Sequence, residues 1–428
     1  MNGLNNHAKS PILLDFSLLK TNANFRAVFF ARFISILGLG MLTVAVPVQI
    51  QMMTGSTLQV GLAVTLDGIG MFIGLLLGGV LADRLDRRKL ILFARFTCGL
   101  GFIGLSFNAF SATPSLWVLY VLAAWDGFFG ALGMTALMAA TPSLVGRENL
   151  AAAGGLSMLT VRFGSVISPA IGGLVIVYGG VGWNYGIAAV GTMLTLLPLL
   201  RLPAMKPATH QHEHPLRALA TGISFVFSHK VVGSVVLLGT LVSMIGAIRI
   251  LFPALAENTY HVGASQIGLM YSVVPLGATI GAFTSGWVNQ VRRPGVVLMY
   301  SSIAAFLAIG TLGLTHNFYL ALPGLLLYGY LGSISGLLQY TLVQTHTPDA
   351  LLGRVNSLWN VQFVAGESFG ALGLGVLAKV MAPALSALTF GAAAAALGGI
   401  IAVCGGTLRR ATMGGEGEDN SADEVVAD

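Results

Sequence analysis

The chain has 428 residues, of which 55% are hydrophobic and only 9% are charged, and its formal net charge is +6. Soluble domains carry about 25% charged residues, so this composition excludes a water-soluble fold and places the chain in a lipid bilayer. The two cysteines, Cys98 and Cys404, lie inside apolar stretches and give no indication of a disulfide framework.

Long apolar segments follow one another along almost the whole chain. The first begins near Phe25 and is too long for a signal peptide, so residues 1–24 are expected to be retained as a cytoplasmic N-terminal segment. A membrane-spanning helix needs about 20 mostly apolar residues. Twelve segments meet this requirement: 25–51, 57–82, 90–110, 115–140, 151–178, 181–201, 231–257, 265–289, 295–315, 318–346, 350–378 and 383–408. The chain is therefore predicted to be an all-α polytopic membrane protein with 12 transmembrane helices.

Lysine and arginine concentrate in every second loop. The intervening loops "MMTGSTLQ", "NAFSATPS" and "YGGVGWN" contain none. By the positive-inside rule the basic loops are cytoplasmic, and because the number of crossings is even, both termini are cytoplasmic too. The basic residues are divided among loops and form no patch interleaved with aromatic residues, so no nucleic-acid partner is expected.

The two halves of the chain repeat each other. "LQVGLAVTLDGIGMFIG" (58–74) aligns with "SQIGLMYSVVPLGATIG" (265–281) at an offset of 207 residues, and "TPSLVGR" aligns with "TPDALLGR" at the same offset when read from the Gly-Arg pairs 146–147 and 353–354. Such a repeat predicts two six-helix bundles with a substrate site between them near the bilayer midplane. The expected bundles are 25–201 and 231–408, joined by a cytoplasmic linker at 202–230 and followed by an acidic, disordered cytoplasmic tail at 409–428.

The loop "GGVLADRLDRRK" places two acids and four bases in seven residues, 83–89. It resembles the signature loop of the major facilitator superfamily, in which such charges hold the cytoplasmic side shut. The matching residues are Gly79, Asp83, Arg84, Arg87 and Arg88. Asp86 departs from the pattern, where the family usually has glycine. The alternative interpretation is an ordinary basic cytoplasmic loop.

The fifth expected helix reads "GLSMLTVRFGSVISPAIGG". Its spacing resembles the glycine-proline pattern of the superfamily's drug and metabolite exporters, with serine in place of one glycine. The matching residues are Gly155, Gly164, Ser168, Pro169, Gly172 and Gly173. Small residues let helices approach closely and proline bends them, so ordinary helix packing is the alternative explanation.

Ionisable residues inside spans are costly and normally face a cavity or a partner. They include Arg32, Asp67, Asp126, Arg162, Arg249 and Glu367. Asp126 and Arg162 lie at similar depths on consecutive helices, so we expect them to pair, either as a structural clasp or as a proton site that substrate releases. Arg249 and Glu367 are expected along the exit path. Asp67 shares a face with two glycines and is expected to pack against a helix.

Aromatic residues Trp125, Phe129, Trp359 and Phe363 lie near these charges and are expected either to stack on flat substrate rings or to pack between helices. The histidine run at 210–214 lacks the spacing of a zinc helix, and no phosphate-binding G-x-x-x-x-G-K-[ST] loop occurs. Neither a metal, a cofactor nor an enzymatic activity is therefore expected.

Across about residues 12–408 the chain resembles siderophore exporters of the major facilitator superfamily, most densely at 17–62, 125–129, 158–169 and 337–348. The resemblance implies export of the catecholate siderophore enterobactin, or a similar catecholate, across the bacterial inner membrane. It implies proton antiport with alternating access, and we expect a monomer. Two alternatives stay open: a broad antiporter of drugs and aromatic metabolites, and a membrane scaffold or sensor that does not transport.

Overall fold

The computed structural model describes residues 17–206 and 215–412. The histidine run at 210–214 and most of the expected tail lie outside these residues. Every regular element in the described residues is helical. The predicted all-α class is therefore confirmed.

The first half of the chain contains α1 to α7. Their bounds are α1 Ser17–Thr21, α2 Ala23–Thr54, α3 Thr57–Arg84, α4 Arg87–Phe110, α5 Leu116–Val145, α6 Leu150–Leu194 and α7 Leu196–Leu199, with the short 3-10 helix η1 at Arg147–Asn149.

The second half contains α8 to α16. The α-helices are α8 Pro215–Ser228, α9 Lys230–Gly246, α10 Phe252–Leu255, α11 Ala264–Thr284, α12 Pro294–Gly310, α13 Phe318–Thr345, α14 Asp349–Val380, α15 Pro383–Cys404 and α16 Gly406–Arg410. Four short helices of other types connect them: η2 Ala247–Leu251, η3 Ala256–Tyr260, η4 Ser285–Gln290 and η5 Thr311–Gly313.

Eleven helical stretches in the described residues are long and apolar enough to cross a membrane. One of them, Leu150–Leu199, has 50 residues. At 1.5 Å per residue such a helix would be about 75 Å long, which exceeds two bilayer cores. Gly180, with φ of 80°, interrupts it where the sequence predicts a turn between two spans. These two crossings and the other ten make twelve.

One expected span, 231–257, is not a continuous α-helix. The α-helix ends at Gly246 and passes through the 3-10 helix η2 before α10 begins. Pro253, in the first turn of α10, has no N–H to continue the preceding hydrogen-bond ladder, which accounts for the change of helix type. The interruption places Arg249 in the irregular segment.

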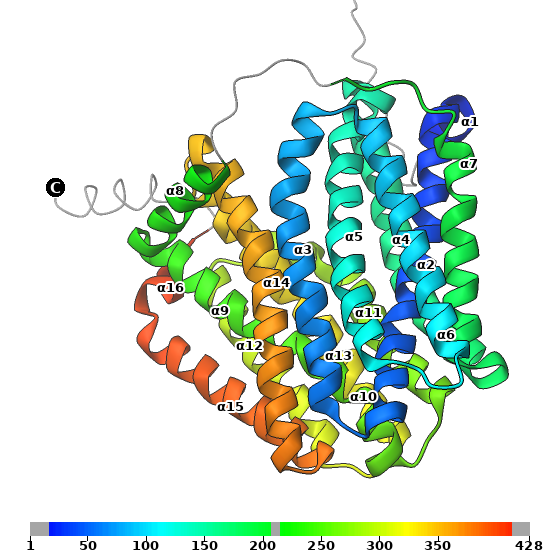
Figure 1. Cartoon of the computed structure of the whole chain (residues 1–428). Helices are drawn as coiled ribbons and strands as arrows, with labels where there is room; N and C mark the ends of the chain where they lie inside the picture. The colour runs from blue at the N-terminus through cyan, green and yellow to red at the C-terminus, as the bar shows by residue number, and fades with distance from the viewer. Residues whose placement is uncertain (1–16, 207–214, 413–428) are drawn as a thin grey trace, which may run out of the picture.

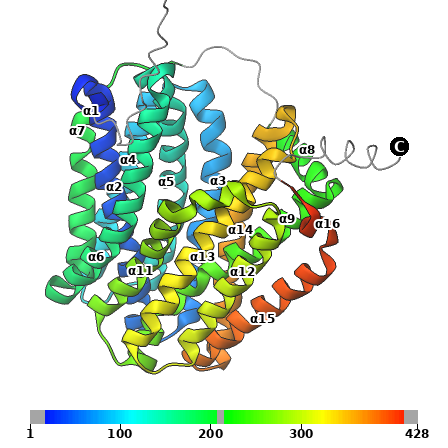
Figure 2. The same ribbon diagram turned by 180° about the vertical axis from the view of Figure 1, so that it is seen from behind.

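The two halves form two groups of helices side by side (Figures 1 and 2). In the first half α3 packs on α5, and across the boundary it packs on α14. In the second half α11 packs on α13, and across the boundary on α6. Gly61 and its repeat mate Gly268 occupy these two boundaries: a Cβ on either would lie 2.6 Å from a backbone oxygen, of Ala371 and Pro169 respectively. Small residues therefore bring the halves together at symmetry-related positions.

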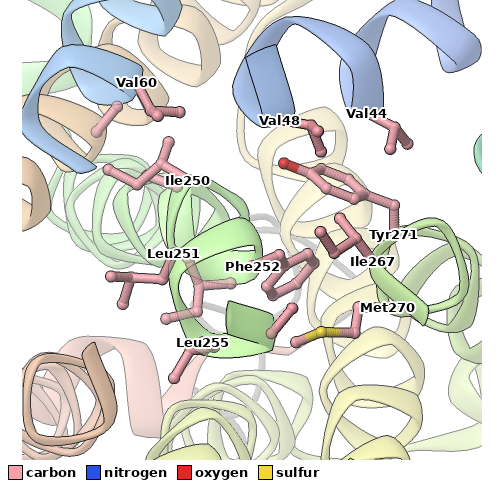
Figure 3. Close-up of a cluster of buried hydrophobic side chains, with 14 of the residues drawn as sticks. Val44, Val48, Val60, Ile250, Leu251, Phe252, Leu255, Ile267, Met270 and Tyr271 are labelled. Atoms are coloured by element: carbon pink, nitrogen blue, oxygen red, sulfur yellow. The ribbon is translucent and has the colours of Figure 1, made fainter. Parts of the chain in front are cut away.

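The buried side chains divide the molecule into a joined end and a separated end. Arg84, Arg88 and Arg201 lie at one end, which we call the basic face. Near the basic face the core is two separate clusters, one built only from residues 18–205 and one only from residues 226–411. Toward the opposite face one cluster combines both halves, and Figure 3 shows Val44, Val48 and Val60 of the first half near Ile250 and Tyr271 of the second. The halves are thus closed together at the opposite face.

Candidate functional site

A cavity of about 840 Å³ lies between the two halves. Its walls come from α2 and α6 of the first half and from α9, η2, α11, α13 and α14 of the second. The lining extends from Tyr271, in the cluster that closes the opposite face, to Ser285 at the basic-face end of α11. The cavity is therefore approached from the basic face, and its size suits a small-molecule ligand.

Arg249 and Glu367 form an ion pair in the cavity wall. The interrupted helix holds Arg249 in place, because its Nε donates to the Gly246 carbonyl at 3.3 Å and its own carbonyl accepts from the Tyr271 hydroxyl at 2.8 Å. The side chains are 40% and 22% exposed, so the cavity reaches both charges. The structure thus brings together two residues that the sequence placed on one path.

Arg162 lines the same cavity from α6. Among the residues that the structure describes, no carboxylate forms an ion pair with it. Its neighbours in the lining include Ser165 and Thr43, which add hydroxyl groups. An unpaired guanidinium in a mainly apolar cavity is equipped to bind an anionic or catechol-type oxygen pair.

The expected pairing of Asp126 with Arg162 is wrong for this conformation. Asp126 instead lies beside the Cys98 thiol and interacts electrostatically with Arg95. The reason lies in packing: α5 contacts mainly α3 and α4, α6 contacts mainly α2, α11 and α4, and α5 and α6 make little contact with each other. Equal depth on consecutive helices does not determine which helix faces meet.

Arg95 was missed by the sequence reasoning, although it is a charge inside the expected span 90–110. It also lies close enough to Arg32 for the two cations to interact. One carboxylate oxygen of Asp126, Oδ1, is buried without a hydrogen-bond partner in the described residues. The sequence signal for Arg95 was its charge inside an apolar span, because such charges normally have a partner or face a cavity.

Of the four aromatic residues expected near the charges, Phe363 lines the cavity, and the other three pack elsewhere. Trp125 donates from its indole nitrogen to the Thr97 carbonyl at 2.8 Å, and Phe129 stacks edge-on against Phe93, so both pack on α4. Trp359 packs against the second-half cluster near the basic face. The aromatic residues that line the cavity are Tyr271, Tyr328 and Phe363.

The glycine-proline pattern of α6 lies where three helices converge. Gly164 and Gly172 approach Ile36 and Met41 of α2, and Gly173 approaches Gly268 of α11. Ser168 and Pro169 line the cavity, and Gly155 lies in the second turn of α6, nearer the basic face. The pattern therefore sets the spacing between α6, its own bundle and the other half.

The charged loop after α3 is fastened to the chain that leaves the first bundle. Arg87 donates to the Ala139 carbonyl at 3.0 Å, and Arg88 donates to the Leu200 carbonyl. Asp86 caps α4 by accepting from the Arg88 amide at 2.9 Å and also accepts from the Met205 amide at 3.1 Å. The Arg87 amide donates back to the Met205 carbonyl at 3.1 Å.

Asp86 thus gives the departure from the family pattern a structural explanation. Its partial burial acts to raise the pKa of the carboxyl, but the amide donors of Met205, Arg88 and Lys89 hold the pKa below its ordinary value. Of the other loop residues, Gly79 and Arg84 are exposed. Asp83 makes its own interactions at the end of α3. The hydrogen bonds of Asp86 and Arg87 with Met205 therefore hold the loop against the first residues of the linker.

Two curated relatives cover nearly the whole chain. "Enterobactin exporter EntS" of Citrobacter koseri is 56% identical over 398 residues, which is 93% of this chain and 95% of the relative. The protein of the same name from Escherichia coli strain UTI89 is 57% identical over 383 residues, 90% of this chain and 92% of the relative.

Solved transporters share the fold at low sequence identity. Nucleoside transporter NupG superposes with a TM-score of 0.72 at 13% identity, over 91% of this chain and 100% of that chain. A POT family transporter superposes with a TM-score of 0.72 at 14% identity, over 90% and 97%. The family model "Major Facilitator Superfamily" matches residues 28–371. With its twelve crossings, its two matched halves and the cavity between them, the chain belongs to the Major Facilitator Superfamily.

Proposed function

We propose that this transporter exports enterobactin, or a similar catecholate siderophore, from the cytoplasm to the periplasm across the bacterial inner membrane. Relatives at 56% and 57% identity carry the name of an enterobactin exporter and are matched over more than nine tenths of their length. Such relatives, like the solved neighbours, are transporters, which favours transport over an enzymatic activity or a scaffold.

The observation that carries the proposal is the unpaired Arg162 in a cavity with aromatic walls. A catechol presents a flat ring and two neighbouring oxygens. The ring can stack on side chains such as Tyr271 and Phe363, and a guanidinium can donate to both oxygens at once. A siderophore with several catechols would need such contacts on more than one wall, and the cavity has a guanidinium on each half, Arg162 and Arg249, with its aromatic side chains on the second half.

The direction of transport follows from the orientation that the basic loops favour. If the basic face is cytoplasmic, the cavity is open to the compartment in which the substrate is made, and the closed cluster of Figure 3 separates it from the periplasm. This conformation is the loading state of an exporter. Rocking of the halves would then open the cavity outward.

We propose proton antiport as the energy source, with the intramembrane acids as the coupling groups. Asp126 and Glu367 each lie beside an arginine, so protonation of either acid changes the local charge balance. We expect Asp126→Asn to abolish transport driven by a pH gradient while the protein still reaches the membrane. Undiminished proton-dependent efflux by this variant would remove Asp126 from the mechanism.

A broad exporter of drugs and aromatic metabolites is the second candidate, and the mainly apolar lining favours it. Efflux of labelled enterobactin from loaded liposomes, with and without an imposed pH gradient, tests the first proposal directly. The first proposal also requires that a strain lacking the gene accumulates enterobactin in its cells, and that restoring the gene reverses this accumulation. Efflux of unrelated aromatic cations at equal rates would favour the second candidate.

A further inference from the structure

Asp67 lies on α3 between two neighbouring helices. A Cβ on Gly127 of α5 would lie 2.9 Å from the Asp67 carboxylate oxygen Oδ1, so this side chain is directed at α5. On its other side, a Cβ on Gly68 would lie 2.0 Å from the Ser368 hydroxyl of α14, the residue after Glu367. Thr65 also donates to the Ser368 carbonyl, at 3.1 Å. Asp67 therefore sits at the boundary between the two halves.

The charged groups around Asp67 come from both halves of the molecule. From α5 it interacts with Asp126, and from across the boundary with Glu367 of α14 and Arg249 of η2. Arg95 of α4 interacts with Asp126, and also with Arg32 of α2. The group as a whole contains three carboxyl groups and three guanidinium groups.

The charges nearest Asp67 favour its neutral form. An ionised Asp67 would face two acids, Asp126 and Glu367, and one base, Arg249, inside the bilayer, where an uncompensated charge is costly. Glu367 is paired with Arg249, and Asp126 has Arg95 and the Cys98 thiol. No side chain or amide in the described residues donates a hydrogen bond to the Asp67 carboxylate. Asp67 is therefore the acid that gains most from being neutral.

We propose that Asp67 is the proton-carrying carboxyl group at the boundary between the halves, which deepens and rests on the antiport proposed above. When the halves separate at the opposite face, the seam between α3 and α14 opens and Asp67 takes up a proton from that side. When the halves close, as in this structure, Asp67 faces Glu367, which lines the cavity open to the basic face. The lower proton concentration on that side then draws the proton from Asp67 to water in the cavity, against the preference of Asp67 for its neutral form, and Asp67 remains an anion until it is protonated again.

This mechanism couples the proton to the movement of the halves. Asp126 and Glu367 keep their partners within their own half, so their surroundings change less when the halves rock. Asp67 has an acidic neighbour in its own half, Asp126, and both an acidic and a basic neighbour across the boundary, Glu367 and Arg249. A coupling group must change its surroundings between the two conformations, and Asp67 meets that requirement.

The first test measures the proton itself, without substrate. Infrared difference spectra of the purified protein, recorded during acid titration, report the carbonyl band of a protonated carboxylic acid. We expect Asp67→Asn to remove a band that Asp126→Asn retains. A wild-type protein without such a band, or a band unchanged in Asp67→Asn, would overturn the inference whatever the substrate is.

The second test separates coupling from folding. In proteoliposomes, we expect Asp67→Asn to exchange labelled for unlabelled enterobactin at a rate within about twofold of wild type, and to lose at least tenfold of the accumulation driven by a pH gradient. Asp67→Glu, which keeps a titratable group, should recover part of that accumulation. Retained pH-driven accumulation in Asp67→Asn, or loss of exchange in both variants, contradicts the role. A wild-type protein without substrate-stimulated proton flux would instead refute the antiport proposal.

Discussion

Adding one methyl group at Gly61 should push the two halves apart at the opposite face. A Cβ there would lie 2.6 Å from the backbone oxygen of Ala371 on α14 and 3.3 Å from Cδ1 of Ile250. Both neighbours belong to the other half, so the clash is relieved when the halves separate. Overpacking of this kind costs about 1–3 kcal/mol. If the cost falls only on the closed state, it shifts the equilibrium toward the outward-open state by about 5- to 150-fold.

Gly74→Ala provides a matched control on the same helix. A Cβ on Gly74 would lie 2.3 Å from the Phe128 backbone oxygen of α5, which belongs to the same half. Both substitutions gain the same helix propensity, up to about 1 kcal/mol. Gly74→Ala should therefore lower the thermal stability without changing which face is open.

The assay is labelling of a single cysteine from the opposite face. Cys98 and Cys404 are replaced by serine, and Val48, which is 4% exposed in the closing cluster, is replaced by cysteine. A membrane-impermeant maleimide should react faster with this cysteine in Gly61→Ala than in the parent, and at the parent rate in Gly74→Ala. Equal or slower labelling in Gly61→Ala would refute the assignment of this cluster as the gate that opens.

Three further changes test the site and the loop. Arg162→Gln should weaken binding of the catecholate by about 10- to 150-fold, since a hydrogen bond to a charged group contributes about 1.5–3 kcal/mol. Fluorescence quenching measures this binding, and the affinity should fall less in Arg162→Lys, which keeps the positive charge. Arg249→Gln leaves the Glu367 carboxylate unpaired and should cost about 1–3 kcal/mol, less than a fully buried pair because both side chains face the cavity; thermal unfolding in detergent should show recovery in the double variant with Glu367→Gln. Asp86→Ala removes the cap of α4 and should speed hydrogen exchange at the Met205 amide by roughly 2- to 30-fold. Because the pKa of Asp86 lies below its ordinary value of 3.8, this protection should persist from neutral pH down to that value and disappear only in stronger acid, whereas loss of protection near pH 6 would contradict the assignment.

The sequence by itself determined the twelve crossings and the pairing of the halves. Both follow from local properties: the length of each apolar segment against the thickness of the bilayer, and a repeat with one constant offset. It also identified the ionisable residues inside spans, because their cost in lipid does not depend on the fold. Arg249 and Glu367 were predicted on one path and are paired in the structure.

Only the tertiary structure decided which of these groups meet. Asp126 and Arg162 have similar depths, yet they face different neighbours because α5 and α6 make little contact with each other. Asp67 looks from the sequence like a packing residue, and it does pack against α5. Its charged neighbours on α14 and η2 come from about 180 to 300 residues further along the chain, so no local pattern could reveal them. The face to which the cavity opens depends in the same way on how the two halves close upon each other, and that is a property of packing across the whole molecule.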